Sequence, residues 1–192
     1  RTEPQGASMA VTNEEIAEAV QGQTIPTEFL KIVRAHPDQV ALRWKNDDDS
    51  WGEWTYTDYA DRVAQVAAAL GDLGVERGDK VVLMMRNDPK FHVVDMAAYF
   101  AGATPVSIYN SSSAEQVEYL VNHSEAKVAI VQDMGFLQRF LDVRPALPTL
   151  ETIVVLEDPD GQAPDDVLGH DDLHSRGSVD LDEASKVVEP AD

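Results

Sequence analysis

The chain has 192 residues, of which 43% are hydrophobic, so it can form one α/β domain or part of a larger protein. Its 35 acidic and 15 basic residues give a net charge of −20, which argues against nucleic acid as a partner and against electrostatic docking on anionic lipid. It contains no cysteine, which excludes disulfides, thiolate metal sites and a cysteine nucleophile.

Residues 1–11 are polar, carry no secretory signal pattern and are predicted to be disordered. No apolar run approaches the ~20 residues of a transmembrane segment. The lack of cysteine is compatible with a reducing compartment, and we expect a cytoplasmic protein. Peripheral contact with a membrane and homodimerisation both stay open.

Two short helices and a hairpin are predicted first. Thr12 and Glu15 have capping-box spacing and predict a helix through Val20. Thr24 then opens a second helix that ends before Pro37. Residues 40–44 and 51–56 read as strands joined by a polar turn, which predicts a β-hairpin.

A long amphipathic helix follows, which we expect Thr57 and Asp58 to open and Gly74 to end. Residues 78–110 then form the central unit of strand, helix and strand. The run at residues 81–85 is continuously apolar, as in a strand that is covered on both faces. Asp88 is a good N-cap, Pro89 suits the first helical position, and Gly102 can stop the helix in a left-handed conformation.

The same alternation continues through residues 113–122 (helix), 127–131 (strand), 134–141 (helix) and 152–156 (strand). The sequence therefore predicts an α/β fold for residues 12–156: a largely parallel sheet flanked by helices, with the helical segment and the hairpin in front. Residues 157–192 hold 12 acidic and two basic residues, so a packed layer is not expected from this segment alone, and we expect an acidic surface connection.

Three sequence patterns are candidate sites. Gly71, Gly74 and Gly78 follow a helix and precede a strand, so they predict a helix stop and a turn rather than a dinucleotide-binding loop. The turn at residues 110–113 follows a strand and precedes a helix. It could receive an anion on its backbone amides, but the simpler interpretation is that Ser113 and Gln116 cap the next helix.

His170 and His174 are four residues apart and could share a metal ion if that segment were helical. However, the surroundings read as a loop, the pattern is not that of a zinc protease, and no third ligand is evident. Three isolated histidines are expected to be caps or surface residues: His36, His92 and His123. No nucleophile elbow, Walker motif or acid–base pair of carboxylates is visible, so residue chemistry alone assigns no catalytic, cofactor-binding or metal-binding residue.

Several segments together resemble the adenylate-forming (AMP-binding) superfamily. They are Trp-Thr-Tyr-Thr-Asp at residues 54–58, Leu-Gly-Val-Glu-Arg-Gly-Asp-Lys-Val at 73–81, Asn-Asp at 87–88 and Ala-Gly-Ala at 101–103. Pro-Val-Ser-Ile-Tyr-Asn-Ser-Ser-Ser-Ala-Glu-Gln at 105–116 and Asn-His-Ser-Glu-Ala-Lys at 122–127 are similar to the long-chain fatty acyl-CoA synthetase branch. The resemblance covers residues 25–156.

The resemblance implies a two-step ligase. A fatty acid and ATP, assisted by Mg²⁺, give an acyl-adenylate and pyrophosphate, and CoA then displaces AMP. In this family the phosphate loop follows a segment like residues 187–192, so we expect an N-terminal fragment that lacks its C-terminal part. Such a fragment is expected to be inactive and to bind none of these cofactors alone. A free-standing binding module and another adenylate-forming acid ligase are the alternatives.

Overall fold

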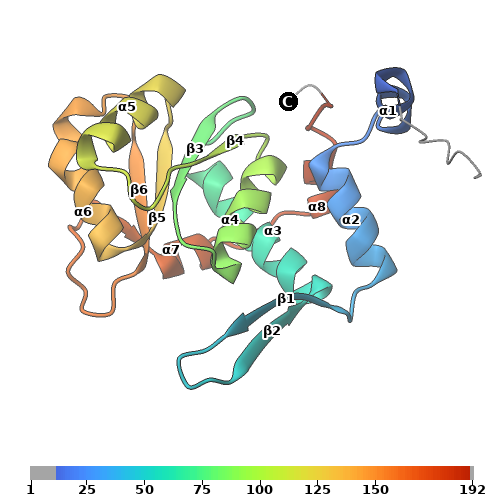
Figure 1. Cartoon of the computed structure of the whole chain (residues 1–192), viewed down its shortest axis with the longest axis horizontal. Helices are drawn as coiled ribbons and strands as arrows, with labels where there is room; N and C mark the ends of the chain where they lie inside the picture. The colour runs from blue at the N-terminus through green and yellow to red at the C-terminus, as the bar shows by residue number, and fades with distance from the viewer. Residues whose placement is uncertain (1–11, 191–192) are drawn as a thin grey trace, which may run out of the picture.

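The computed structural model describes residues 12–190, and the disorder predicted for residues 1–11 lies outside that range. The described residues form a five-stranded sheet and a separate two-stranded hairpin (Figure 1). The sheet consists of β3 (Lys80–Met84), β4 (Thr104–Ser107), β5 (Val128–Asp133), β6 (Thr152–Glu157) and β7 (Leu168–Gly169). Its order is β4-β3-β5-β6-β7, and every neighbouring pair is parallel. The predicted α/β class is confirmed.

The hairpin and the first six helices follow the predicted order, whereas the last two helices were not predicted. The hairpin pairs β1 (Val40–Lys45) with β2 (Trp51–Thr55) in antiparallel fashion. The helices are α1 (Asn13–Ala19), α2 (Ile25–Ala35), α3 (Tyr56–Asp72), α4 (Pro89–Phe100), α5 (Ala114–Ser124), α6 (Met134–Val143), α7 (His170–His174) and α8 (Leu181–Ser185). Within residues 12–190, none of them combines the length and apolar character that a membrane crossing needs.

Successive residues of the central strands alternate between two cores. Val81 and Leu83 of β3 pack with α3 and α4, whereas Val82 and Met84 pack with α5 and α6. β5 and β6 alternate in the same way. Figure 1 shows α5 and α6 on one side of the sheet and α3 and α4 on the other. The continuous apolar runs in these strands therefore arise because both faces are covered.

The β3–α4–β4 unit begins and ends its helix as the sequence predicts. The Asp88 carboxylate accepts a hydrogen bond from the Lys90 N–H at 2.8 Å, and Pro89 occupies the first helical position. Gly102 ends the connection with a φ of +73°, and a Cβ at this position would lie 3.2 Å from the Cα of Arg77. Glycine is required here both by the backbone conformation and by the close approach.

Helix α3 begins earlier than the sequence analysis predicted. Thr55, not Thr57, is its N-cap. The Asp58 N–H donates to the Thr55 hydroxyl at 3.1 Å, and the Asp58 carboxylate accepts from the Thr55 N–H at 2.9 Å. Thr57 instead donates its hydroxyl to the Pro37 carbonyl. The prediction missed that Thr55 and Asp58 are three residues apart, which is the spacing of a capping box.

The acidic segment packs more closely than its composition predicted. β7 extends the sheet, with Leu168 in register with Val154 of β6. Leu173 of α7 is fully buried, and Val179 and Leu181 pack on the same core. Residues 168–184 form no layer of their own, but they are more than a surface connection because they add apolar side chains to an existing core. A few well-spaced apolar side chains suffice here because α3, α4 and β6 supply the remaining apolar surface.

Candidate functional site

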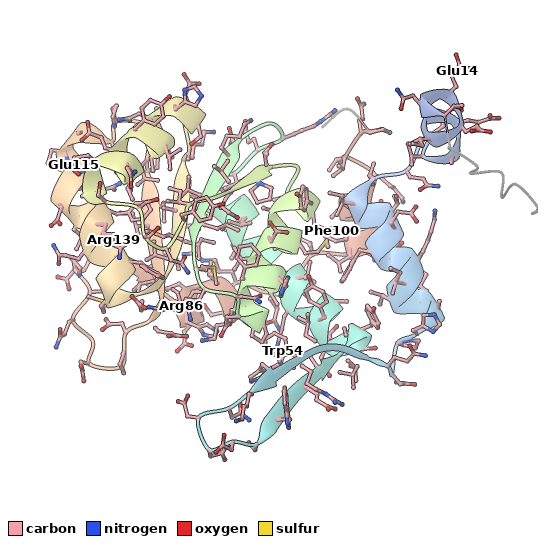
Figure 2. The ribbon with its side chains drawn as sticks, in the orientation of Figure 1. Glu14, Trp54, Arg86, Phe100, Glu115 and Arg139 are labelled. Atoms are coloured by element: carbon pink, nitrogen blue, oxygen red, sulfur yellow. The ribbon has the colours of Figure 1, made fainter. Side chains whose placement is uncertain are left out.

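The carboxyl ends of the parallel strands form the edge of the sheet at which the chain changes direction. From β3 the chain passes to β4 on one side, and β5 then lies on the other side of β3. The crevice at such a switch point is the usual ligand site of open α/β sheets. Arg86 lies two residues after the end of β3, and its side chain is labelled in Figure 2. We take this edge as the candidate site.

A buried glutamine joins the loops after β3 and β5. The side chain of Gln132 is 6% exposed, and its Oε1 accepts from the backbone N–H of Arg86 at 2.7 Å. The Arg86 guanidinium pairs with Asp133 and lies 4.6 Å from the ring centroid of Phe136. Burial alone would raise the pKa of Asp133, but hydrogen bonds from Arg86 and from the Phe136 N–H outweigh burial and lower this pKa. Asp133 is therefore held ionised at the switch point.

A second ion pair joins α4 to β6. The Nζ of Lys90 lies 2.7 Å from Oε1 of Glu157, and Gln132 donates to the same carboxylate at 3.4 Å. Each of the two cations, Arg86 and Lys90, therefore has a carboxylate partner. Because these charges are already matched, the network stabilises the loops more readily than it could receive a multiply charged anion.

A hollow of about 620 Å³ opens between the ends of β3 and β4. Met85, Phe91 and Ile108 contribute apolar wall, and Asn87 and Asn110 contribute polar groups. Tyr109 lies beside it and is 85% exposed. The side chains at this hollow can pack against another surface, but among them only Arg86 is charged, and it is paired with Asp133.

The turn at residues 110–113 caps α5, as the sequence favoured. The Ser113 N–H donates to Oε1 of Gln116 at 2.9 Å, and the Gln116 N–H donates back to the Ser113 hydroxyl. Arg139 of α6 donates to the carbonyl oxygens of Asn110 and Ser112 (Figure 2 labels Arg139). These contacts give the turn a structural role, and anion binding there stays a prediction.

His170 and His174 lie on the short helix α7 and not in a loop, which corrects the sequence prediction. Their ring centroids are 4.5 Å apart, and Nδ1 of His174 lies 2.9 Å from Oε1 of Gln65. Burial, and then the neighbouring His170 and Arg62, lower the pKa of His174. Within residues 12–190, no group of three His, Asp or Glu side chains converges as a metal site would require.

The three glycines lie at the opposite, amino-terminal edge of the sheet. Gly71 is in the last turn of α3, and Gly74 and Gly78 adopt positive φ values of 79° and 91° before β3 begins. The Gly78 N–H donates to the carbonyl of Gly102 at 2.9 Å. These positions fit the predicted helix stop and turn. A loop that binds a dinucleotide would have to lie at the carboxyl-terminal edge of the sheet instead.

A sequence model of the AMP-binding enzyme family matches residues 29–191, which is most of the chain. The chain belongs to the AMP-binding enzyme family. The predicted superfamily is thereby confirmed.

Relatives within the family differ greatly in length. An uncharacterised protein of Mycobacterium tuberculosis is 38% identical over 135 residues, which cover 70% of this chain and 73% of that protein. The long-chain-fatty-acid–CoA ligase heimdall of Drosophila melanogaster is 30% identical over 146 residues, which cover 74% of this chain but 21% of the ligase. Long-chain fatty acid–CoA ligases, the branch that the sequence resembles, are thus among the relatives. The chain spans about a fifth of the length of the Drosophila ligase.

Solved structures share the fold. The anthranilate CoA ligase AuaEII, in complex with anthranoyl-AMP, aligns with a TM-score of 0.73 and 24% identity over 82% of this chain and 29% of that ligase. The acetoacetyl-CoA synthetase of Streptomyces lividans aligns with a TM-score of 0.71 and 23% identity over 81% of this chain and 25% of the synthetase. In both of these enzymes the matched fold is only part of a longer chain.

Membership of the AMP-binding enzyme family implies ATP-dependent chemistry, but the described residues do not fit a triphosphate site. The loops after β3 and β5 are not rich in glycine, Arg86 and Lys90 are neutralised by carboxylates, and Arg139 donates to the backbone carbonyls of Asn110 and Ser112. A phosphate site needs unpaired donors and backbone amides that converge. We therefore derive no adenylation step from residues 12–190.

Two features of this family member were not predicted from the sequence. Gln132 follows the apolar run of β5, and an amide at the end of a buried strand could have been recognised as a group that must find partners. Arg62 shares a face of α3 with Gln65 and Val66, and its contact with Trp54 brings together residues that no local motif connects. The contact of Arg62 with Trp54 depends on tertiary packing and could not be predicted from the sequence.

Proposed function

We propose that the chain is the N-terminal part of a cytoplasmic long-chain fatty acid–CoA ligase. The observation that carries this proposal is the family match over residues 29–191, together with relatives named as long-chain-fatty-acid–CoA ligases at 26–33% identity. The whole enzyme would convert a fatty acid, ATP and CoA into acyl-CoA, AMP and pyrophosphate, with Mg²⁺ and an acyl-adenylate intermediate.

In this proposal the chain is a scaffold. Residues 12–156 would form an α/β subdomain, and residues 157–192 would lead to the phosphate loop. Arg86 and Lys90, the cations next to the loop after β3, are already paired with carboxylates and so are poorly suited to stabilise the charge developing on pyrophosphate. Since such stabilisation is often the largest contribution to catalysis, the 192 residues alone are expected to be inactive.

The test is ATP–pyrophosphate exchange with and without palmitate. We would compare the 192-residue chain with the product of its complete reading frame. The longer product should catalyse exchange that depends on palmitate, and the 192-residue chain should not. Exchange by the 192-residue chain would contradict its inactivity, and a reading frame that stops at residue 192 would contradict the ligase.

A panel of acids tests the choice of substrate. Another adenylate-forming acid ligase is the nearest alternative, because an anthranilate CoA ligase shares this fold. If the longer product adenylates aryl or short-chain acids faster than palmitate, the long-chain assignment is wrong. A preference for palmitate over benzoate and acetate supports it.

A free-standing binding module is a second candidate. It is favoured by the Mycobacterium tuberculosis relative, of which this chain covers 73%. Under the ligase proposal, the remaining polypeptide should cover exposed aromatic side chains such as Tyr109 and Tyr119, which are 85% and 64% exposed. A hydrophobic dye should then bind the longer product less than the 192-residue chain, whereas equal binding favours the module.

A further inference from the structure

Strand β1 of the hairpin carries backbone groups that point away from its partner strand. The Asn46 N–H donates to the Ser50 carbonyl at 2.9 Å, so the ladder bonds between β1 and β2 lie at every second residue, Trp44 included. Arg43 and Lys45 lie between these positions and direct their N–H and C=O groups away from β2. Within residues 12–190, no carbonyl of another backbone segment accepts a hydrogen bond from either N–H group.

A groove of about 370 Å³ lies between this edge and the start of α4. Residues 42–45 of β1 form one wall, and residues 87–89 with His92 form the other. The volume falls within the range of ligand sites, roughly 300–1,000 Å³. The outward backbone groups of β1 therefore face open space, although a helix lies nearby.

The apolar wall of the groove is held in place by the hairpin itself. The Trp44 Nε1 donates to Oδ1 of Asn46 at 2.9 Å, and the centroids of the Trp44 and Trp54 rings lie 4.9 Å apart. Gly52 leaves room for the Trp44 ring, because a Cβ at this position would collide with it. A wall that is already ordered lowers the entropy cost of binding.

The two cations of β1 do not close its edge. Charged side chains often protect a strand edge from pairing. Here, however, Arg43 pairs with Glu53 on β2, and Lys45 pairs with Asp49 in the turn. Both side chains are thus drawn toward the hairpin, and a ligand beside them needs no charge of its own.

The edge strand of the large sheet lacks this donor pattern. The Thr104 N–H of β4 donates to the Asp79 carbonyl at 2.9 Å, so the next residue, Pro105, faces outward. Proline has no N–H group and is a common protection of sheet edges. β1 contains no proline, so its outward N–H groups remain able to donate.

We propose that the edge of β1 binds an extended peptide of a partner protein as a third strand of the hairpin. Alternate residues of an extended chain repeat every ~7 Å, which matches the spacing of the outward groups of Arg43 and Lys45. In this binding mode, main-chain hydrogen bonds provide affinity and alternate side chains provide selectivity.

The two faces of β1 define the side chains of the peptide. Leu42 and Trp44 share one face and favour β-branched apolar residues. The opposite face carries the matched charges of Arg43 and Lys45 and favours uncharged polar residues. The expected partner segment thus alternates residues such as valine and threonine. The proposal concerns the hairpin and does not depend on the ligase assignment.

The experiment titrates the 192-residue chain with a peptide of alternating valine and threonine, blocked at both ends, and follows amide hydrogen exchange by nuclear magnetic resonance. The peptide should slow the exchange of the Arg43 and Lys45 amides. The Trp44 amide, which already lies in the ladder, should change little. If the first two amides are protected before peptide is added, the edge is already covered and the proposal is overturned.

Two N-methylated peptides test the backbone contact without changing the protein. One is methylated on the valine nitrogens and the other on the threonine nitrogens, so both keep every side chain. Because only alternate N–H groups of the peptide face β1, one peptide should bind like the parent and the other should lose binding. Equal affinities of the two methylated peptides would overturn the proposal.

A matched pair of variants tests the protein side. Arg43→Pro removes an N–H that faces the groove and should weaken peptide binding roughly fivefold or more, as expected for one hydrogen bond. Glu53→Pro breaks the same ion pair, but the Glu53 N–H lies on the far edge of β2. This control should bind the peptide like the unmodified chain. Unchanged binding by Arg43→Pro, or a greater loss in Glu53→Pro, would contradict pairing at β1.

Discussion

The core beneath α5 and α6 and the acidic segment at residues 157–190 both pack against the same sheet, yet they do so differently. Phe140, Leu137 and Ile153 are at most 2% exposed and interlock in the first region. In the second region only Leu173 among the large apolar side chains is completely buried, and Val179 and Leu181 are partly exposed. The region beneath α5 and α6 is a continuous core, whereas the acidic segment contacts the rest of the protein through a few apolar side chains.

This difference shows that average composition is a poor guide to packing when a neighbour supplies the apolar surface. The acidic segment also uses its backbone: β7 pairs with β6, and the Val179 N–H donates to the Ala64 carbonyl of α3 at 3.2 Å. Backbone hydrogen bonds make no demand on side-chain polarity. An acidic sequence can therefore follow a folded surface closely while its carboxylates stay in water.

The largest expected effect is in the continuous core. Phe140→Ala should lower the free energy of unfolding by about 3–5 kcal/mol, because it leaves a cavity among fully buried neighbours. Urea unfolding followed by circular dichroism would measure it. Leu141→Ala, at a partly buried position of the same helix, should cost less. Equal losses in the two variants would contradict the assignment of Phe140 to the centre of this core.

The next effect tests whether the acidic segment belongs to the folded unit. Leu173→Ala should lower the free energy of unfolding by about 2–4 kcal/mol, since Leu173 is fully buried against the first core. Val187→Ala, at a side chain that is 56% exposed, is the control and should cost under about 0.5 kcal/mol. A loss below about 0.5 kcal/mol for Leu173→Ala would mean that the segment is not part of the cooperative core.

The sequence predicted most of the fold because its signals are local. The continuous apolar runs indicated β3, β5 and β6, and Asp88 with Pro89 marked the start of α4. β7 has two residues and α7 and α8 have five each, too few for hydrophobic periodicity to be visible. Their formation depends on contacts with β6 and α3, which the sequence alone does not reveal.

The candidate site was less predictable. The switch point follows from strand order, and strand order is a tertiary property. The contact of Arg62 with Trp54 joins a helix to a hairpin strand, and the contact of Gln65 with His174 joins residues 109 positions apart. The spacing of His170 and His174 identifies them as a pair, but the contact of His174 with Gln65 depends on the packing of α7 against α3.

A smaller effect concerns the start of α3, the helix on which the acidic segment packs. Thr55→Ala should lower the free energy of unfolding by about 1 kcal/mol, because the capping box with Asp58 is lost. Thr57→Ala, which removes one exposed hydrogen bond to Pro37, should cost under about 0.5 kcal/mol. Urea unfolding of both variants distinguishes the observed cap from the predicted one, and a larger loss for Thr57→Ala would favour the latter.

The smallest effect is the pH dependence that His174 gives to the acidic segment. Burial, His170 and Arg62 lower its pKa below 6.5, while Asp171 opposes them. As the pH falls through 6.5, the unfolded chain takes up this proton before the folded chain does, so stability should fall until the lower folded pKa is passed.

Unfolding in urea between about pH 7.5 and 5.5 would measure this loss, which should be modest because His174 is only half-buried. His174→Gln should show a smaller loss over the same range, since it removes the titrating ring. His36→Gln, at an exposed residue that ends α2, should keep the loss of the unmodified protein. Identical pH profiles for the His174→Gln variant and the unmodified protein would show that α7 does not hold this ring against α3, and the acidic segment would then be anchored by Leu173 and its backbone alone.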